Sequence, residues 1–289
     1  MDFLTKHSVK IFRVINPLLP FKNYTLSYYF SRFGNNLQQI AVGALYANVN
    51  NGNFYSPPHK YIKEFSVINR LTYDMFSLLK KRYRFFYFHG KKDFVGRKLN
   101  SEYVINNIQK IFKENIRKNI KFIEDSPLDE DTLVIHVRSG DIFVDVKKDY
   151  YQNPINFYTE IMREYKKVIV VTSEDKLNPI CLELEKISKV TFQTLSMEAD
   201  FNTLYNSKNL ATSGVGTFPI AAALLSKELR NFYYTNLFLD EHLNPTMLRD
   251  TKIVHHKYNI SSSYVNKYEK QDDFKRLILD RSIDVKKEN

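Results

Sequence analysis

The chain has 289 residues, of which 43% are hydrophobic and 15% aromatic, so it can form a full hydrophobic core and does not have the composition of a disordered protein. Its formal net charge of +11 makes polyanions candidate partners: nucleic acid, an anionic membrane face or a nucleotide diphosphate. The single cysteine, Cys181, excludes an intrachain disulfide and a cysteine-based zinc cluster, and it fits a reducing compartment.

The amino-terminal half predicts a mixture of strands and helices. The apolar segment 14–21 is short and contains two prolines, so it lacks the pattern of a signal peptide, although peripheral membrane contact through this basic end stays open. Tyr24–Phe30 predicts a strand, and apolar residues at helical spacing over 37–47 predict a helix after a glycine turn. A further strand is predicted at Phe85–Phe88 and a helix at Ser101–Lys118.

Strands and helices alternate more regularly after a linker at 126–131. This alternation predicts parallel βαβ units and hence a Rossmann-like domain. The uncharged stretch 209–226 contains glycine and proline and therefore predicts a loop running into a helix rather than a membrane span. From about Asp240 onward the pattern places no element before 274–278. The expected strands are 133–137, 168–172, 189–192, 209–212 and 231–234, and the expected helices are 154–165, 179–187, 199–205 and 218–226.

The segment Leu133–Phe143 carries the most informative residues. A β-branched apolar run ends in a histidine, an arginine and an aspartate around one glycine, where a buried strand meets a loop. Ligands of open α/β sheets bind at the carboxyl ends of strands, so Arg138 is placed to hold a phosphate, and Asp141 to orient Arg138 or to bind a ligand hydroxyl. The simpler alternative is an ordinary strand end with a surface Arg–Asp pair.

Two further glycine turns precede predicted helices. One contains Gly34 and Asn35, and the other, Ser213–Phe218, has two glycines and hydroxyl side chains ahead of an alanine-rich helix. Such turns favour backbone N–H contacts to a phosphate, although each one alone has an equally simple structural explanation. Neither matches a Walker P-loop or the G-x-G-x-x-G dinucleotide fingerprint.

Taken together, these motifs resemble the fucosyltransferase superfamily, which includes α-1,2-fucosyltransferases, α-1,6-fucosyltransferases and protein O-fucosyltransferases. The resemblance covers residues 25 to 235, with the motifs in the family's order. They are Ser31-Arg32-Phe33-Gly34-Asn35-Asn36 for G-R-[LF]-G-N-Q, His136-Val137-Arg138-Ser139-Gly140-Asp141 for H-x-R-R-G-D, Ser173-Glu174-Asp175 for Ser-Asp-Asp, and Asp200-Phe201-Asn202-Thr203-Leu204 with Ser213-Gly214-Val215-Gly216-Thr217-Phe218-Pro219-Ile220-Ala221-Ala222 for the closing pattern.

The resemblance implies an α/β protein of the GT-B class, with two Rossmann-like domains facing across a cleft. The domains would span 1–125, on the acceptor side, and 130–240, on the nucleotide-sugar side, with an extension at 241–289. The implied activity is inverting, metal-independent transfer of fucose from GDP-fucose to a hydroxyl of a glycan acceptor, with no cofactor.

Under this resemblance Arg138 binds the donor pyrophosphate and stabilises charge as the nucleotide leaves. Asp200 would accept hydrogen bonds from guanine, and His136 would contact the base or ribose or brace the loop. Asp141 is assigned with Arg138 to catalysis as a candidate general base. The remaining residues assigned to the donor are Gly34, Asn35, Ser173, Ser213, Gly216, Thr217 and Phe218.

The chain departs from the family pattern at several positions. Ser139 replaces the second arginine, Ser-Asp-Asp is Ser-Glu-Asp, and the Ser-Thr-Phe core is Gly-Thr-Phe followed by proline. Because Arg138 is retained, nucleotide-diphosphate binding stays the expectation, whereas the donor could be another GDP-sugar or another nucleotide. The general base stays open among Asp141, Asp145, Glu174, Glu64 and Asp74.

No metal site is expected. The adjacent His255 and His256 point in different directions in any regular element, and we interpret them as a solvated pair. Besides a glycosyltransferase with an oligosaccharide or polysaccharide acceptor, two classes stay open. One is a binding-only relative without turnover, because of Ser139. The other is a nucleic-acid binder, although nucleic acid is not expected because the tyrosines lie in apolar segments. The expected location is the cytoplasm, with the inner face of a membrane as the alternative.

Overall fold

The computed structural model describes residues 23–26, 28–29, 32–68, 81–83, 88, 99–144, 150–270 and 274–288, with the backbone alone at 81–83 and 269–270. The segment 14–21, most of the strand expected at 85–88, and the general-base candidates Asp74 and Asp145 lie outside these residues. The chain divides into two compact units, 1–122 and 123–289, called unit 1 and unit 2 below.

Unit 1 contains a four-stranded sheet in the order β3-β2-β1-β4. β1 pairs parallel with β2 and β4, whereas β3 is antiparallel to β2. The helix α2 (Phe33–Val49) joins β1 to β2, so these three elements form a parallel βαβ unit. The strands are β1 (Asn23–Leu26), β2 (Asn53–Ser56), β3 (Phe65–Val67) and β4 (Lys81–Tyr83).

The helix α2 is almost completely buried, which agrees with its sequence, because it contains no charged residue. Close packing on the sheet requires glycine at Gly43, where an added Cβ would lie 2.3 Å from the Phe54 ring. The helix expected at 101–118 is also present. It consists of α3 (Ser101–Lys110), a π-helical turn η3 (Ile111–Ile116) and a 3₁₀ turn η4 (Arg117–Asn119).

Unit 2 is a mixed α/β structure with a seven-stranded sheet in the order β11-β10-β9-β8-β5-β6-β7. All neighbouring strands are parallel except β11, which is antiparallel to β10. The large parallel sheet confirms the α/β class predicted from the alternating pattern. The strands are β5 (Thr132–His136), β6 (Lys167–Val171), β7 (Val190–Gln193), β8 (Asn209–Ala211), β9 (Asn231–Thr235), β10 (Val254–Ile260) and β11 (Val285–Lys287).

The strand order reverses between β5 and β8. From β5 the chain runs outward through β6 to β7 and then returns to place β8 on the other side of β5. In chain order, the first six strands of this sheet have the spatial order 3-2-1-4-5-6, which is that of the Rossmann fold. In such sheets, ligands bind beside the carboxyl ends of the two strands that flank the reversal.

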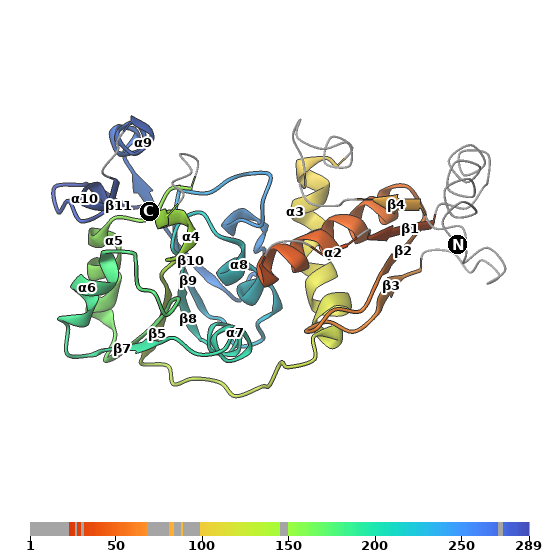
Figure 1. The fold of residues 1–289 in the computed structure, drawn as a ribbon, viewed down its shortest axis with the longest axis horizontal. Helices are drawn as coiled ribbons and strands as arrows, with labels where there is room; N and C mark the ends of the chain where they lie inside the picture. The colour runs from red at the N-terminus through yellow and green to blue at the C-terminus, as the bar shows by residue number, and fades with distance from the viewer. Residues whose placement is uncertain are drawn as a thin grey trace. The chain divides into compact units, whose positions relative to one another are not determined.

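Helices cover both faces of this sheet, as Figure 1 shows, with α5 and α6 on one side and α7 and α8 on the other. On the α5 side, side chains of the strands form a continuous core with α5, α6, α9 and α10. The helical elements are α4 (Asp141–Val144), α5 (Ile155–Ile161), η5 (Met162–Glu164), α6 (Ile180–Glu185), α7 (Met197–Tyr205), α8 (Thr217–Leu225), η6 (Pro245–Met247), α9 (Ser262–Lys270) and α10 (Phe274–Ile278).

The carboxyl-terminal residues are part of this fold. Residues 241–289 supply β10, β11, α9 and α10, although the sequence pattern places only the last of these. His255 and His256 point in different directions, as the sequence predicts, but both are part-buried rather than solvated. Their side chains lie on opposite faces of β10, where His256 stacks on Tyr233 at 4.3 Å between ring centroids and His255 packs edge-on against Tyr234 at 5.9 Å. Within the described residues, no helix combines the length and the apolar character needed to cross a membrane.

Candidate functional site

The carboxyl end of β5 brings the histidine and the arginine of the central motif to the reversal point. The strand is buried over Thr132–Ile135, and its pairing continues one residue further, since Val137 N–H donates to the Val171 carbonyl at 2.9 Å. The chain then turns at Gly140, whose φ of +80° is a conformation that glycine adopts without strain. This turn leads directly into the short helix α4, which starts at Asp141.

Within the described residues, three groups contact the Arg138 guanidinium and hold it in place. Nη1 donates to the Val215 carbonyl at 3.4 Å, Nη2 lies 3.6 Å from Asp141 Oδ1, and the guanidinium carbon lies 4.7 Å from the centre of the Tyr150 ring. The Arg138 side chain is 17% exposed, whereas that of Asp141 is 53% exposed. Arg138 is therefore a fixed cation that still reaches solvent, and Asp141 orients it as the sequence predicts.

Ser139, which stands where the family pattern has a second arginine, is 2% exposed and fully engaged in hydrogen bonds. Its hydroxyl donates to Asp175 Oδ1 at 2.7 Å and accepts from the Asn178 backbone N–H at 2.9 Å. The Asn178 side chain in turn donates to the Arg138 carbonyl at 2.9 Å. The serine therefore joins the loop after β5 to the loop after β6, and it holds the backbone that carries Arg138.

Asp175 is the acceptor at the centre of this junction. Partial burial raises the pKa of its carboxyl, but hydrogen bonds from the Ser139 hydroxyl, the Leu177 backbone N–H and the Ser173 hydroxyl outweigh burial, so the pKa lies below its ordinary value. Ser173 donates to Asp175 at 3.1 Å. The structure thus gives Ser173, assigned to the donor from sequence, a bond that stabilises this loop.

The carboxyl end of β8 supplies the other side of the site. His136 Nδ1 and Ser213 Oγ share a hydrogen bond at 3.1 Å, which links the two strands that flank the reversal. The His136 ring also lies 5.7 Å from the ring of Phe218, and Phe218 packs edge-on against Phe201 at 5.2 Å. His136 thus braces the junction between the two strand ends, one of the two roles expected for it.

The nine-residue helix α8 starts at this point. Gly216 is its N-cap and has no side chain to bond the first backbone N–H groups, which lack partners within any helix. Thr217 and Phe218 form the first turn, and the rest of the helix, Pro219–Leu225, is buried. A helix amino terminus carries a partial positive charge, so this end of α8 and the Arg138 guanidinium both favour an anion.

The segment Tyr150–Asn153 fixes the backbone of the loop between β8 and α8. Val215 N–H donates to the Tyr151 carbonyl at 3.0 Å, and Asn153 N–H donates to the Ser213 carbonyl at 3.2 Å. Gly214 has φ +95°, and a Cβ there would lie 2.5 Å from the Tyr151 oxygen. Glycine is therefore required at this position both by the backbone conformation and by the close approach of the segment.

Two tyrosines of α9 hold this segment from the other side. The Tyr264 hydroxyl donates to the Gln152 carbonyl at 2.6 Å, and the Tyr268 hydroxyl donates to the Tyr150 carbonyl at 2.9 Å. Burial raises the pKa of Tyr268. Because Tyr150 lies under the Arg138 guanidinium, α9 is coupled through Tyr150 to the cation of the site.

Asp200 lies in the first turn of α7, after β7, and it is part-buried. Its Oδ1 accepts from the Gln193 side chain at 2.9 Å and from the Leu195 backbone N–H at 3.2 Å. Burial raises the pKa of this carboxyl, and the two hydrogen bonds lower it by less. Asp200 therefore fixes the loop between β7 and α7, and its assignment to guanine stays a prediction.

Gly34 and Asn35 belong to unit 1, in the first turn of α2 after β1. The sequence predicts them in a glycine turn before the helix, whereas the helix already begins at Phe33 and includes both. Their assignment to the donor stays a prediction. In unit 2, by contrast, the structure brings together the two strand ends and the start of α8. The expected residues at this location are His136, Arg138, Asp141, Ser213, Gly216, Thr217 and Phe218.

Sequence reasoning missed four contributors to this site: Tyr150, Asn178, Tyr264 and Tyr268. Tyr150 lies between the arginine motif and Ser173-Glu174-Asp175, and no motif includes it. The two α9 tyrosines lie 112 and 118 residues from their acceptors, a separation that local patterns do not report. Among the general-base candidates in the described residues, Glu64 and Glu174 are exposed, and only Asp141 contacts Arg138.

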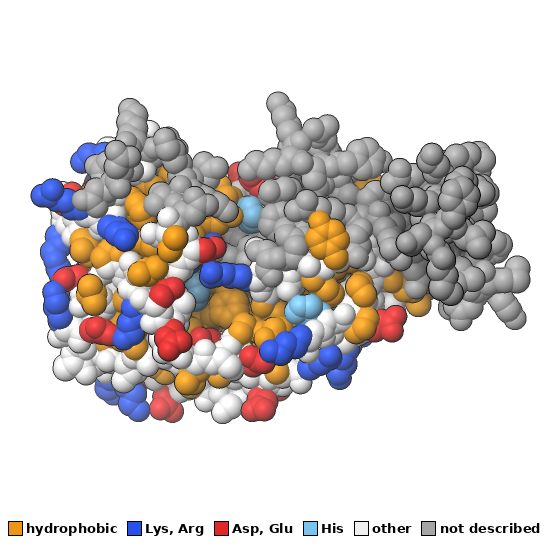
Figure 2. Space-filling model, viewed as in Figure 1, with side chains coloured by type: hydrophobic (Ala, Val, Ile, Leu, Met, Phe, Trp, Pro, Cys, Tyr) orange, Lys and Arg blue, Asp and Glu red, His pale blue; other side chains and the backbone are white. Residues whose placement is uncertain are grey.

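Charged side chains of both signs are interspersed on the face of unit 2 that Figure 2 shows. Several form surface pairs, such as Lys166 with Asp131 at 2.6 Å and Lys227 with Asp125 at 2.8 Å. This mixed surface differs from the continuous basic stripe that is typical of a nucleic-acid binder. Among the residues whose placement is described, no group of three His, Cys, Asp or Glu side chains is arranged to hold a metal ion.

No protein-family model matches the sequence, and no curated protein matches it significantly. Three solved structures are similar in fold. "POFUT1 in complex with GDP" has 12% identity and a TM-score of 0.37, with coverage of 75% of this chain and 98% of that chain. "POFUT1 in complex with GDP-fucose" has 11% identity and a TM-score of 0.38, with the same coverage. "NodZ alpha-1,6-fucosyltransferase soaked with GDP-fucose" has 12% identity and a TM-score of 0.34, with coverage of 71% and 93%. Because these values are low, we draw nothing about function from the likeness.

Proposed function

We propose that unit 2 binds a nucleoside diphosphate sugar and that the protein transfers the sugar to a hydroxyl of a glycan. The observation that carries this proposal is the position of Arg138 beside the amino terminus of α8, at the point where the strand order reverses. A fixed guanidinium and a helix amino terminus are two groups that stabilise a diphosphate without a metal ion. The order of the motifs along the chain supports GDP-fucose as the first donor to test.

In this proposal Arg138 binds the diphosphate and stabilises the charge that develops as the bond to the sugar breaks. Its forked donors suit two phosphate oxygens at once, which a lysine ammonium does not. The backbone N–H groups at Gly216 and Thr217 bind further oxygens of the same diphosphate. His136 and Ser213 hold the two strand ends at a constant spacing, and Phe218 packs on the bound nucleotide or sugar.

The finer parts of this function follow from the motif resemblance and stay predictions. They are the GT-B arrangement of the two units, inversion at the anomeric carbon, independence from metal ions, contacts of Gly34 and Asn35 with the donor, and guanine recognition by Asp200. Asp141 is the candidate general base that contacts Arg138, at 3.6 Å between Nη2 and Oδ1.

Release of GDP from GDP-fucose tests the proposal, measured with and without a panel of oligosaccharides and repeated with EDTA. We expect acceptor-dependent release that EDTA does not change and that Arg138→Ala reduces by about 100-fold or more. Release with another nucleotide sugar would retain the transferase and replace the donor. Binding of a nucleotide with no release under any condition would support the binding-only alternative that Ser139 suggests.

A further inference from the structure

A separate cavity lies in unit 2 beside β9 and β10. The connections that follow β7 and β8 contain the helices α7 and α8, whereas the connection between β9 and β10 contains only the 3₁₀ turn η6. Between this connection and the sheet is a cavity of about 350 Å³. That volume is near the lower end of the range for small-molecule sites, so it suits a ligand the size of one ring.

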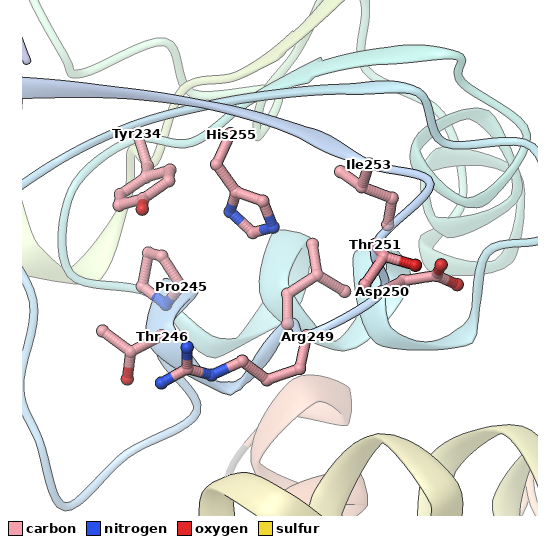
Figure 3. A pocket seen from close by; sticks show the side chains of 9 residues that line it. Tyr234, Pro245, Thr246, Arg249, Asp250, Thr251, Ile253 and His255 are labelled. Carbon is pink, nitrogen blue, oxygen red and sulfur yellow. The ribbon is translucent and has the colours of Figure 1, made fainter. Parts of the chain in front are cut away.

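Two aromatic rings from neighbouring strands form one wall of this cavity. Tyr234 of β9 and His255 of β10 lie on the same face of the sheet, with their ring centroids 5.9 Å apart. Figure 3 shows both rings facing the cavity, with Pro245 between Tyr234 and Thr246. A wall of a phenol, an imidazole and a proline ring is flat and largely apolar, and it suits the face of a saturated ring.

The polar rim of the cavity consists of Thr246, Arg249 and Asp250, and hydrogen bonds hold it in a defined conformation. Asn244 Oδ1 accepts from the Thr246 backbone N–H at 3.0 Å and from the Thr246 hydroxyl at 2.6 Å. Because that hydroxyl donates its proton to Asn244, its oxygen is oriented as an acceptor. At the other end of the rim, Asp250 Oδ1 accepts from the Lys252 backbone N–H at 3.0 Å and thereby stabilises the turn before β10.

The charges of the cavity lining balance. Arg249 and Asp250 contribute one positive and one negative formal charge from adjacent positions. Burial lowers the pKa of His255, and the positive charge of Arg249 lowers it further, so this imidazole is neutral at pH 7. Arg249 can only donate hydrogen bonds and the Asp250 carboxylate can only accept them. A ligand that contacts both side chains must both donate and accept, and the hydroxyl groups of a sugar do so.

We propose that this cavity binds one neutral monosaccharide unit of a glycan. The apolar face of the sugar ring packs on Tyr234 and Pro245, one hydroxyl accepts from Arg249, and a hydroxyl on the opposite side of the ring donates to Asp250. A hydroxyl can also donate to the Thr246 oxygen. This site is distinct from the diphosphate site at Arg138, and it does not depend on the identity of the nucleotide.

The test is a titration of the full chain with the methyl glycosides of glucose, galactose, mannose and fucose. Binding is measured by calorimetry and by ligand-observed NMR. At least one glycoside is expected to bind, and Arg249→Ala and Asp250→Asn are each expected to weaken it by about tenfold or more. Asp250→Asn retains the oxygen that caps the turn, so it removes the charge without removing that bond. Lys252→Ala is the matched control, because Lys252 is an exposed cation of the same turn that does not line the cavity.

Three results would overturn the proposal. The first is no binding of any methyl glycoside, and the second is binding that both variants leave unchanged. The third is tighter binding of glucuronate or inorganic phosphate than of the neutral sugars, which would make the cavity an anion site. Thermal stabilisation by GDP, measured on the same variants, separates this proposal from the proposed function, because Arg249 and Asp250 are not part of the diphosphate site.

Discussion

The Ser139→Ala variant tests whether the residue that departs from the arginine motif is needed for the fold of the site. The substitution removes a hydroxyl that is 2% exposed, together with the bonds to Asp175 at 2.7 Å and to the Asn178 N–H at 2.9 Å. The loss of the acceptor leaves a buried backbone N–H without a partner, which costs about 1–3 kcal/mol. Asp175 is exposed, so water replaces much of the hydrogen bond that its carboxylate loses, and we assign the loss of this bond about 0.5–1 kcal/mol.

Together these effects predict that Ser139→Ala lowers the free energy of unfolding by about 1.5–4 kcal/mol. Urea unfolding followed by circular dichroism measures this, because the chain contains no tryptophan to serve as a fluorescent probe. Ser173→Ala is the matched control. Its hydroxyl also donates to Asp175, at 3.1 Å, but it is part-exposed, so its removal should cost about 0.5 kcal/mol or less. Equal stabilities of the Ser139→Ala variant and the unmodified protein would refute this account of the serine.

Three further predictions concern the same unit. Gly214→Ala places a Cβ 2.5 Å from the Tyr151 oxygen at a φ of +95°. We therefore expect a loss of about 2 kcal/mol or more in the free energy of unfolding, and weaker GDP binding. Unchanged values for both would contradict the close approach of this loop to Tyr151. Tyr268→Phe removes the hydroxyl that donates to the carbonyl of Tyr150, the residue whose ring lies under Arg138. We therefore expect KM for the donor to rise more than kcat falls. Kinetics identical to those of the unmodified enzyme would show that α9 does not position Arg138. Burial first, and then the charge of Lys287, lower the pKa of His256 below 6.5, so its contribution to stability is fully present above pH 6.5 and is lost as the pH falls through the folded-state pKa. His256→Phe should therefore reduce the dependence of the melting temperature on pH between pH 7 and 5. An unchanged dependence would contradict this account of His256.

Local patterns predicted much of unit 2. Three elements can each be predicted from about ten consecutive residues: the apolar run at β5, the glycine turn at Gly214 and the alanine-rich helix α8. Their convergence followed from a general rule, because the carboxyl ends of parallel strands meet at one edge of a sheet. The sequence could therefore place Arg138 and Ser213 near each other without information on pairing.

The elements that the sequence did not place depend on distant partners. β10 reads Val-His-His-Lys-Tyr-Asn-Ile, without the apolar run of β5, and it is a strand because β9 and β11 pair with it on either side. In the sequence, Ser139 is only a position where the motif lacks its second arginine. Its hydrogen-bond partners, Asp175 and Asn178, belong to the loop after β6, more than 30 residues away. Contacts of this kind arise from tertiary packing, which residue spacing does not encode.

The central claim is that Arg138 and the start of α8 form a diphosphate site. Calorimetric titration of the purified protein with GDP in the presence of EDTA tests it most directly, with Arg138→Ala and the control Arg163→Ala, an exposed arginine of the same unit. We predict saturable binding that Arg138→Ala weakens by about 10- to 100-fold, as expected for the loss of charge-assisted hydrogen bonds, and that Arg163→Ala leaves unchanged. Equal GDP affinity in a folded Arg138→Ala protein would contradict the claim.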